Sequence, residues 1–142
     1  MQKVFISYAT NNIQYVRDIR SMANNPNNDT AFIDSSLPEP VRAPNGSIIK
    51  KSPHHESAAP VRNEIHSLLV NSDKLLVIVG PDTHSRKWVE WEIKMFRKLH
   101  TDDDRILLVR CPNDQNSGMP KYISDIEIID WQPEVIKYWL FR

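Results

Sequence analysis

Several kinds of residue and segment are scarce or missing in this chain of 142 amino acids. Its single cysteine, Cys111, has no second thiol with which to form an internal disulfide. No apolar run reaches the length of a membrane span, and no segment has the architecture of a signal peptide. These absences predict a reduced, cytoplasmic protein that does not enter a membrane.

Glycine is also rare, with only Gly46, Gly80 and Gly118 in the whole chain. Glycines so far apart cannot build a P-loop or a dinucleotide-binding fingerprint, because both need closely spaced glycines around a phosphate. A Rossmann-type dehydrogenase is thereby excluded. A phosphoacceptor receiver domain is excluded as well, since it needs clustered acids after its first strand and the segment Phe5–Asn12 contains none.

Neither sign of charge is in excess. The chain has 18 Lys and Arg residues against 18 Asp and Glu residues, so its formal net charge is zero. Without a global positive field, binding to nucleic acid or to an anionic membrane surface is not expected. The length matches one typical domain and we find no internal repeat, so a single domain over residues 1–142 is predicted.

Apolar runs and amphipathic segments alternate along the chain. Strands are predicted where β-branched and aromatic residues cluster, at residues 3–8, 30–36, 74–80, 105–111 and 126–130. Helices are predicted where apolar residues recur three or four positions apart, at residues 12–23, 56–71, 84–93 and from 133 onward. This β/α alternation is typical of an α/β fold, with a mainly parallel sheet and helices on both faces.

Ligands of such a sheet collect at the carboxyl ends of its strands. Three predicted loops open at that edge, and they contain residues 7–12, residues from 34 onward, and residues 81–87. The helix after the third loop begins at the same edge. The search for a functional site therefore concentrates on these loops and on this helix.

The segment "HSRKWVEWEI" of that helix carries two tryptophans and two glutamates. Trp88 and Glu92 are four residues apart, so we expect their side chains on one helical face, lining one pocket. Trp91 and Glu90 are expected to point elsewhere, with Trp91 directed toward the sheet or a neighbouring helix.

Each candidate also has an ordinary structural interpretation. Taken alone, Trp88 is more typical of a core aromatic near the start of a helix. Asp34, at a strand end before two serines, is by itself more typical of a turn or cap residue. Glu92 by itself is more typical of a solvated side chain or of the partner of a nearby cation. The candidate cations are Lys87, Lys94 and Arg97.

Metal and thiol chemistry have weaker support. His54, His55 and Glu56 superficially resemble metal ligands, but no second cluster at zinc spacing accompanies them. We therefore predict no metal site. Cys111 lies in a predicted apolar strand, where a structural thiol is expected rather than a nucleophile.

Three segments carry a family resemblance: "KVFISYATNN" from Lys3, "FIDSSL" from Phe32 and "LLVIVGPDTHSRKWVEWEI" from Leu75. In order and spacing they resemble Toll/interleukin-1 receptor (TIR) domains, and most of all the ThsB-like group of Thoeris anti-phage defence. The third segment is the most specific, since a buried strand, a short polar loop and W-x-x-x-E-I occur together. The resemblance covers most of residues 3–112. It implies a flavodoxin-like/TIR three-layer sandwich with a mainly parallel five-stranded sheet.

The resemblance also implies a site. In enzymatic TIR domains the glutamate that closes the W-x-x-x-E pattern is the catalytic acid, and that position here is Glu92. The implied substrate is NAD, and no cofactor is expected. The residues implied to bind the substrate are Ser7, Tyr8, Ala9 and Thr10 beside the nicotinamide ribose, together with Asp34, Ser85 and Trp88.

The residue types suit the chemistry that the resemblance implies. Cleaving the bond between nicotinamide and ribose passes through an oxocarbenium-like state, so a carboxylate beside the ribose can hold its hydroxyls and stabilise the positive charge. An aromatic wall packs on a flat ring. Linear, cyclic and conjugated forms of ADP-ribose are all open as products.

Partners follow from the same resemblance. The segment from Ser35 to about Pro53 takes the position of the BB loop, through which TIR domains commonly self-associate, although it is proline-rich and contains no Phe, Trp or Tyr. A nucleotide product implies an effector protein that responds to it. The alternative is a catalytically silent TIR interaction or scaffold module. Release of nicotinamide from NAD discriminates between the two.

Overall fold

The computed structural model describes residues 2–8, 13–24, 32–34, 53–80, 87–112 and 125–142. Within these ranges the strands form one sheet in the order β2-β1-β3-β4-β5, and every neighbouring pair is parallel. This is the order of flavodoxin-like sheets. The strands are β1 (Gln2–Ser7), β2 (Phe32–Asp34), β3 (Lys74–Val79), β4 (Ile106–Arg110) and β5 (Ile128–Ile129).

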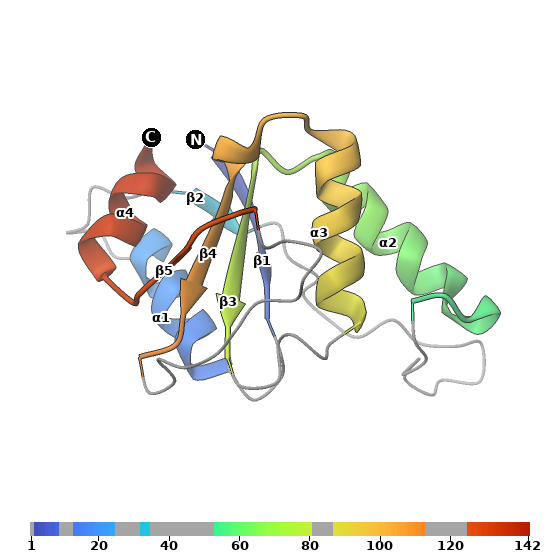
Figure 1. Cartoon of the computed structure of the whole chain (residues 1–142), viewed down its shortest axis with the longest axis horizontal. Coiled ribbons are helices and arrows are strands. Elements are labelled where there is room, and N and C mark those ends of the chain that lie inside the picture. Colours follow the sequence, from blue (N-terminus) through green and yellow to red (C-terminus); the bar gives the residue numbers. More distant parts are fainter. Residues whose placement is uncertain (1, 9–12, 25–31, 35–52, 81–86, 113–124) are drawn as a thin grey trace.

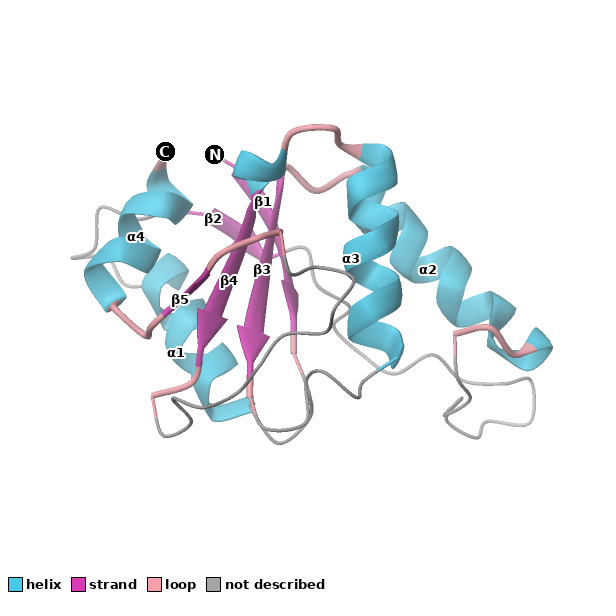
Figure 2. Ribbon diagram, viewed as in Figure 1, coloured by secondary structure: helices cyan, strands magenta, loops and turns pink. Residues whose placement is uncertain are grey.

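Four α-helices cover the two faces of this sheet in the described part of the chain. Figure 2 shows α1 and α4 on one side of the sheet and α2 and α3 on the other. The longest of them, α3, has 13 residues, and no helix in the described ranges is long and apolar enough to cross a bilayer. The helices are α1 (Ile13–Asn24), α2 (Ala59–Val70), α3 (Lys87–Leu99) and α4 (Pro133–Phe141).

Strand alternation divides the core into two clusters. Leu75, Val77 and Val79 of β3 pack with α2 and α3, whereas Leu76 and Ile78 pack with α1 and α4. All six residues of β3 are buried, as expected for a central parallel strand covered on both faces. The predicted three-layer α/β architecture is therefore confirmed.

The element boundaries differ slightly from those predicted. The strand predicted at 126–130 shortens to Ile128–Ile129, because β5 is an edge strand that pairs only with Leu108 and Val109 of β4. The helix predicted from residue 56 begins with a 3-10 turn, η2 (Glu56–Ala58), and α2 proper follows with Pro60 in its first turn. Most of the predicted loop at 35–53 lies outside the described residues.

The order in which the chain adds strands to the sheet reverses between β1 and β3. β2 lies on one side of this pair and β4 on the other, which makes the β1/β3 boundary the topological switch point where ligands of such sheets bind. Ser7, the last residue of β1, is paired in register with Val77 of β3. Figure 1 shows α3 beginning at the edge toward which the arrowheads of β3 and β4 point.

Candidate active site

Glu92 occupies a core position of α3. The buried face of this helix consists of Val89, Glu92, Ile93 and Phe96, which recur at the spacing of an apolar helical stripe. Glu92 is only 9% exposed, and Ser7, at the carboxyl end of β1, is 1% exposed. A carboxyl group and a hydroxyl group are thus buried together at the switch point of the sheet.

The environment of Glu92 disfavours its charge. Burial raises the pKa of its carboxyl to about 8, far above the ordinary value of 4.5, while the nearby Ser7 hydroxyl acts in the opposite direction. Within the described residues, however, neither Glu92 Oε2 nor Ser7 Oγ completes a hydrogen bond. Buried polar atoms are almost always paired, so two orphans at one ligand-binding edge mark a candidate functional site.

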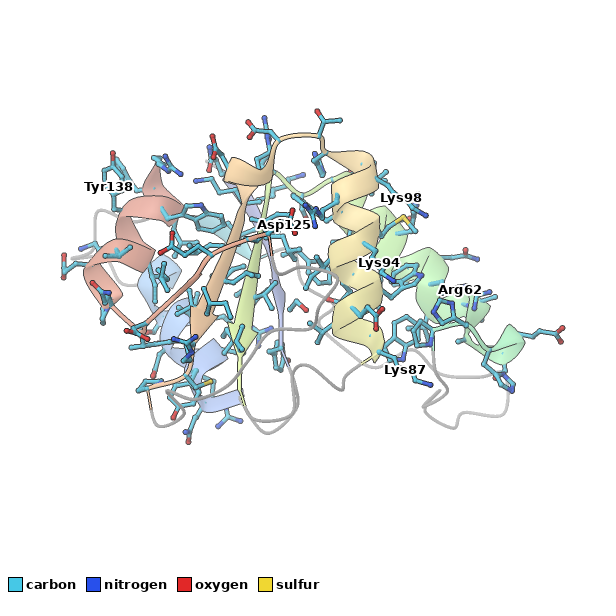
Figure 3. All side chains as sticks on the ribbon, viewed as in Figure 1. Arg62, Lys87, Lys94, Lys98, Asp125 and Tyr138 are labelled. Atoms are coloured by element: carbon cyan, nitrogen blue, oxygen red, sulfur yellow. The ribbon has the colours of Figure 1, made fainter. Side chains whose placement is uncertain are left out.

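The ion-pair interpretation of Glu92 is wrong for two of its three candidate partners. Lys94 Nζ lies 2.9 Å from Oε1 of Glu90, one turn back on the exposed face of α3. Arg97 instead makes two hydrogen bonds to the carboxylate of Asp125. Figure 3 shows the labelled Lys94 and Asp125 around α3. Helical rotation is the reason, since Glu92 faces the core while these cations face outward.

Strand alternation separates two of the residues expected beside the nicotinamide ribose. Ser7 shares its side of β1 with Phe5, which packs with α2 and α3, so it lies on the same face of the sheet as Glu92. Tyr8 is half-buried and packs against the cluster formed with α1 and α4. Of this pair, the structure brings only Ser7 to the carboxyl.

The two tryptophans of α3 form one aromatic pair. Their ring centroids are 5.6 Å apart in an edge-to-face arrangement, and both rings are partly buried against the α2/α3 core. Trp91 does not point away from Trp88, because residues three apart on a helix are neighbours, but it packs on the α2/α3 core, as expected of a ring directed toward a neighbouring helix. Trp88 has the packing of a core aromatic, and its contact with substrate stays a prediction.

Several predicted substrate-binding residues are not placed by the structure. Ala9, Thr10 and Ser85 lie outside the described residues. Asp34 ends β2 and is in register with Val4, three residues before the end of β1. The backbone of Asp34 therefore lies further from the carboxyl edge of the sheet than that of Ser7. Its contact with substrate stays a prediction.

The weaker sequence candidates have structural roles. His55 Nδ1 accepts a hydrogen bond from the backbone N–H of Ser57, so this ring caps the 3-10 turn before α2. In the part of the chain that the structure describes, no group of three or more His, Cys, Asp or Glu side chains is arranged to hold a metal ion. Cys111 is buried in the α1/α4 core cluster, as expected for a structural thiol.

The sequence signal for Glu92 was the W-x-x-x-E pattern. A second signal was available in the stripe of Val89, Glu92, Ile93 and Phe96, which places an acid among apolar residues at helical spacing. Neither pattern shows that Oε2 of Glu92 lacks a hydrogen-bond partner among the described residues. Among the described residues, Ser7 is the side chain found to influence the pKa of Glu92, and the sequence analysis had named it as a substrate-binding candidate.

Comparisons with known proteins bear on the fold and the family of the chain. Among solved structures, a prokaryotic SEFIR domain has a TM-score of 0.59 at 10% sequence identity, over 100% of this chain and 94% of that chain, which is a likeness of fold. None of the curated proteins compared with the chain matches it. The family model described as Thoeris protein ThsB, TIR-like domain, matches residues 5–116, which include both Ser7 and Glu92. The chain therefore belongs to the ThsB TIR-like domain family of Thoeris anti-phage defence.

Proposed function

We propose that this protein cleaves the nicotinamide–ribose bond of NAD and forms an ADP-ribose-derived signal for an effector protein in anti-phage defence. Glu92 is the catalytic carboxyl in this proposal. The observation that carries it is a buried carboxyl beside Ser7 at the switch point of a parallel sheet, with one oxygen, Oε2, that has no hydrogen-bond partner among the described residues. A glutamate with a purely structural role is not expected at such a position, because burying a carboxyl oxygen without a hydrogen-bond partner lowers the free energy of unfolding.

The reaction requires stabilisation of positive charge more than it requires a strong acid. When the bond from C1′ of ribose to the nicotinamide nitrogen breaks, its electron pair leaves with neutral nicotinamide and the ribose becomes oxocarbenium-like. An ionised Glu92 stabilises that cation in a site of low polarity, where electrostatic effects are strong. Water, or a nucleophile of the same or another molecule, then bonds to C1′ and gives the linear, cyclic or conjugated product.

Substrate binding supplies what Glu92 lacks. The unbound carboxyl is mostly protonated at neutral pH because its pKa is about 8. NAD brings ribose hydroxyls, which donate hydrogen bonds, and a positively charged nicotinamide ring. Both favour the ionised form, so the pKa falls when the substrate arrives. The Ser7 hydroxyl acts in the same direction from the end of β1.

The experiment is to incubate the purified protein with NAD, with and without lysate from phage-infected cells, and to measure nicotinamide by chromatography. Glu92→Gln removes the charge at nearly constant volume, and we expect turnover to fall roughly 10³-fold or more. Glu90→Gln is the matched control on the same helix. It loses only a partly exposed pair with Lys94, so its turnover should stay within about twofold of the parent.

The outcomes separate the two hypotheses. Full turnover in a folded Glu92→Gln protein overturns the catalytic assignment. If the parent releases no nicotinamide in either condition, the silent TIR interaction module becomes the better interpretation. Circular dichroism of the parent and both variants establishes that the comparison is made between folded proteins.

A further inference from the structure

A cavity of about 260 Å³ opens at the amino edge of the sheet. Its walls come from the start of β1, the residues that begin β3, the 3-10 turn η4 (Asp103–Arg105) before β4, and the residue that follows α4. Figure 1 shows the end of α4 near the beginnings of β1 and β4, at the edge away from the arrowheads. This amino-edge cavity is therefore separate from the carboxyl edge, where Ser7 and Glu92 lie.

Hydrogen bonds between distant segments fix the walls of the amino-edge cavity. The backbone N–H of Lys3 donates to Asp73 Oδ2, and the N–H of Asp73 donates to the Lys3 carbonyl, each over 2.8 Å. Arg105 Nη1 donates to the backbone carbonyl of Asp73 over 3.2 Å. Gln2 Nε2 donates to the backbone carbonyl of Arg142 over 3.3 Å. The cavity is thus built by contacts of the folded chain and not by one surface loop.

Charged groups of both signs line this cavity without pairing across it. Arg105 and Arg142 supply guanidinium groups, and Asp102 and Asp104 supply carboxylates. All four residues are exposed, so a ligand can reach them. Among the side chains that the structure describes, no ion pair joins any two of these four groups. A ligand that carries both charges could therefore bridge them.

The buried floor of the cavity contains Lys74, whose ammonium group is already occupied. Its Nζ donates a hydrogen bond to the carbonyl of Trp139. Burial lowers the pKa of Lys74, and the positive charges of Arg142 and Arg105 lower it further. Both guanidinium groups therefore lie within electrostatic reach of one buried ammonium group, which locates them around the same cavity.

Gln2 Oε1 is the buried polar atom of this cavity that lacks a partner. No described residue donates a hydrogen bond to it. In the described part of the chain, the other two side-chain atoms in this condition are Ser7 Oγ and Glu92 Oε2, at the candidate active site. Buried polar atoms are almost always paired. An amide oxygen needs a donor, whereas a guanidinium group needs an acceptor, so the cavity calls for both in one ligand.

We propose that the amino-edge cavity binds a small zwitterion of the α-amino acid class. The carboxylate of the ligand binds Arg105 and Arg142, because guanidinium groups form strong charge-assisted hydrogen bonds with carboxylates. Its ammonium group faces Asp102 and Asp104 and donates to Gln2 Oε1. A simple anion would leave the acidic groups and the amide oxygen without a partner, and a simple cation would leave the guanidinium groups without one.

The size and exposure of the cavity limit the ligand and its affinity. Pockets for drug-sized ligands measure roughly 300–1,000 Å³, so a cavity of about 260 Å³ suits a smaller molecule. Water weakens each contact with an exposed charge, so a dissociation constant on the order of 1 mM is expected. The inference does not depend on the proposed NAD chemistry, because no residue of the cavity belongs to the candidate active site.

Glycine is the best probe, because it is the part that all α-amino acids share. Titration of the isotope-labelled 142-residue chain with glycine, followed by two-dimensional amide NMR, should shift the signals of residues 2, 73, 74, 104, 105 and 142 and reach saturation by about 20 mM. Acetate and methylammonium carry the two halves of glycine, and each should bind at least about tenfold more weakly at the same ionic strength. Absence of saturable shifts with glycine, or acetate binding as strong as that of glycine, overturns the proposal.

Substitutions test the assignment of each group. Arg105→Gln and Arg142→Gln each remove one guanidinium group and should weaken glycine binding about fivefold to tenfold. Gln2→Met removes the amide oxygen at similar length and should weaken glycine binding by more than acetate binding. Lys98→Gln, at an exposed position of α3, is the control and should bind glycine like the parent (Figure 3). Unchanged glycine affinity in both arginine variants, with the remaining amide signals in place, overturns the proposed site.

Discussion

In the part of the chain that the structure describes, each edge of the sheet buries one ionisable side chain, Lys74 at one edge and Glu92 at the other, and their hydrogen bonding differs. At the amino edge, Lys74 begins β3 and is 6% exposed. Its Nζ donates a hydrogen bond to the backbone carbonyl of Trp139 and lies 4.7 Å from the centroid of the Trp139 ring. At the carboxyl edge, Glu92 Oε2 has no hydrogen-bond partner within the described residues. The contacts of Lys74 offset the cost of taking its ammonium group out of water, whereas burial of Glu92 raises the pKa of its carboxyl to about 8 and so favours the protonated form.

This difference separates a buried side chain that holds the fold together, Lys74, from one that is a candidate for binding a ligand, Glu92. Burial lowers the pKa of Lys74, the charges of Arg142 and Arg105 lower it further, and Asp73 acts in the opposite direction. The contacts with Trp139 nevertheless occupy the ammonium group and tie α4 to the central strand. Glu92 has one carboxyl oxygen, Oε2, without a hydrogen-bond partner among the residues that the structure describes, and this oxygen can accept a hydrogen bond from a ligand.

The largest expected contrast is in the pH dependence of stability. The pKa of Glu92 is about 8 in the folded protein and about 4.5 when unfolded, so between these pH values the folded state holds one more proton. The free energy of unfolding should therefore fall by roughly 3–5 kcal/mol as pH rises through this window. Glu92→Gln should abolish this slope and be the more stable protein at pH above about 8.

Urea denaturation at several pH values, compared between Glu92→Gln and the parent, isolates this contribution from those of other groups. Glu90→Gln serves as the control and should follow the parent curve, because Glu90 is half-exposed on the outer face of α3. If the free energy of unfolding depends on pH in the same way in Glu92→Gln and in the parent, burial does not raise the pKa of the Glu92 carboxyl.

The next contrast concerns Lys74. Lys74→Ala removes a charged hydrogen bond and the contact with the Trp139 ring, so stability should fall by about 2–3 kcal/mol. NAD turnover per folded molecule should stay unchanged, since Lys74 lies at the opposite edge from Glu92. Lys98→Ala, at an exposed position of α3, should have little effect on either property. Loss of turnover in a folded Lys74→Ala protein would show that Lys74 contributes to activity as well as to stability.

A smaller effect is expected in the pH profile of catalysis. The ratio kcat/KM reports the pKa of the free enzyme, and the proposed mechanism needs an ionised Glu92. With a pKa of about 8, kcat/KM for NAD should rise about tenfold between pH 7 and pH 9. Steady-state rates in buffers of constant ionic strength measure this. A flat profile over that range would show that ionisation of Glu92 does not control the reaction.

The smallest effect is expected from the tryptophan pair. Trp88→Phe keeps an aromatic wall but shortens it, so stability should fall by about 1 kcal/mol and the apparent KM for NAD should rise about threefold. Trp91→Phe should lose similar stability, because the two rings contact each other, while its KM should stay unchanged. If KM rises only in Trp91→Phe, the substrate-facing ring has been misassigned.

The architecture was predictable because local patterns determine it. The continuous apolar run of β3 predicted a strand buried on both faces. The spacing of Val61, Ile65, Leu68 and Leu69 predicted the inner face of α2, where Leu68 is only partly buried and the other three are buried. The short extent of β5 was not predictable. An edge strand ends where its neighbour stops pairing, which depends on β4 and not on the residues of β5 themselves.

The position of the candidate site could be proposed from the sequence, but the hydrogen bonding and protonation of its carboxyl could not. The W-x-x-x-E pattern identified Glu92, yet sequence spacing allowed Lys94 and Arg97 as partners. Arg97 is taken by Asp125, 28 residues further along the chain, and such a pairing is invisible to helical spacing. Lys74 was missed for the same reason, since a lysine at the start of an apolar strand gives no sign of Trp139, 65 residues away.

The pairing of β1 with β3 can form only after both strands have been synthesised. Lys3 and Asp73 exchange two hydrogen bonds of 2.8 Å at the start of this pairing, although they are 70 residues apart in sequence. At about 5–20 residues per second, a ribosome needs several seconds to reach the second partner. The helix that carries Glu92 emerges later still. A chain under synthesis therefore contains Ser7 well before the carboxyl that is to lie beside it, so these two groups cannot come together until most of the domain has been made.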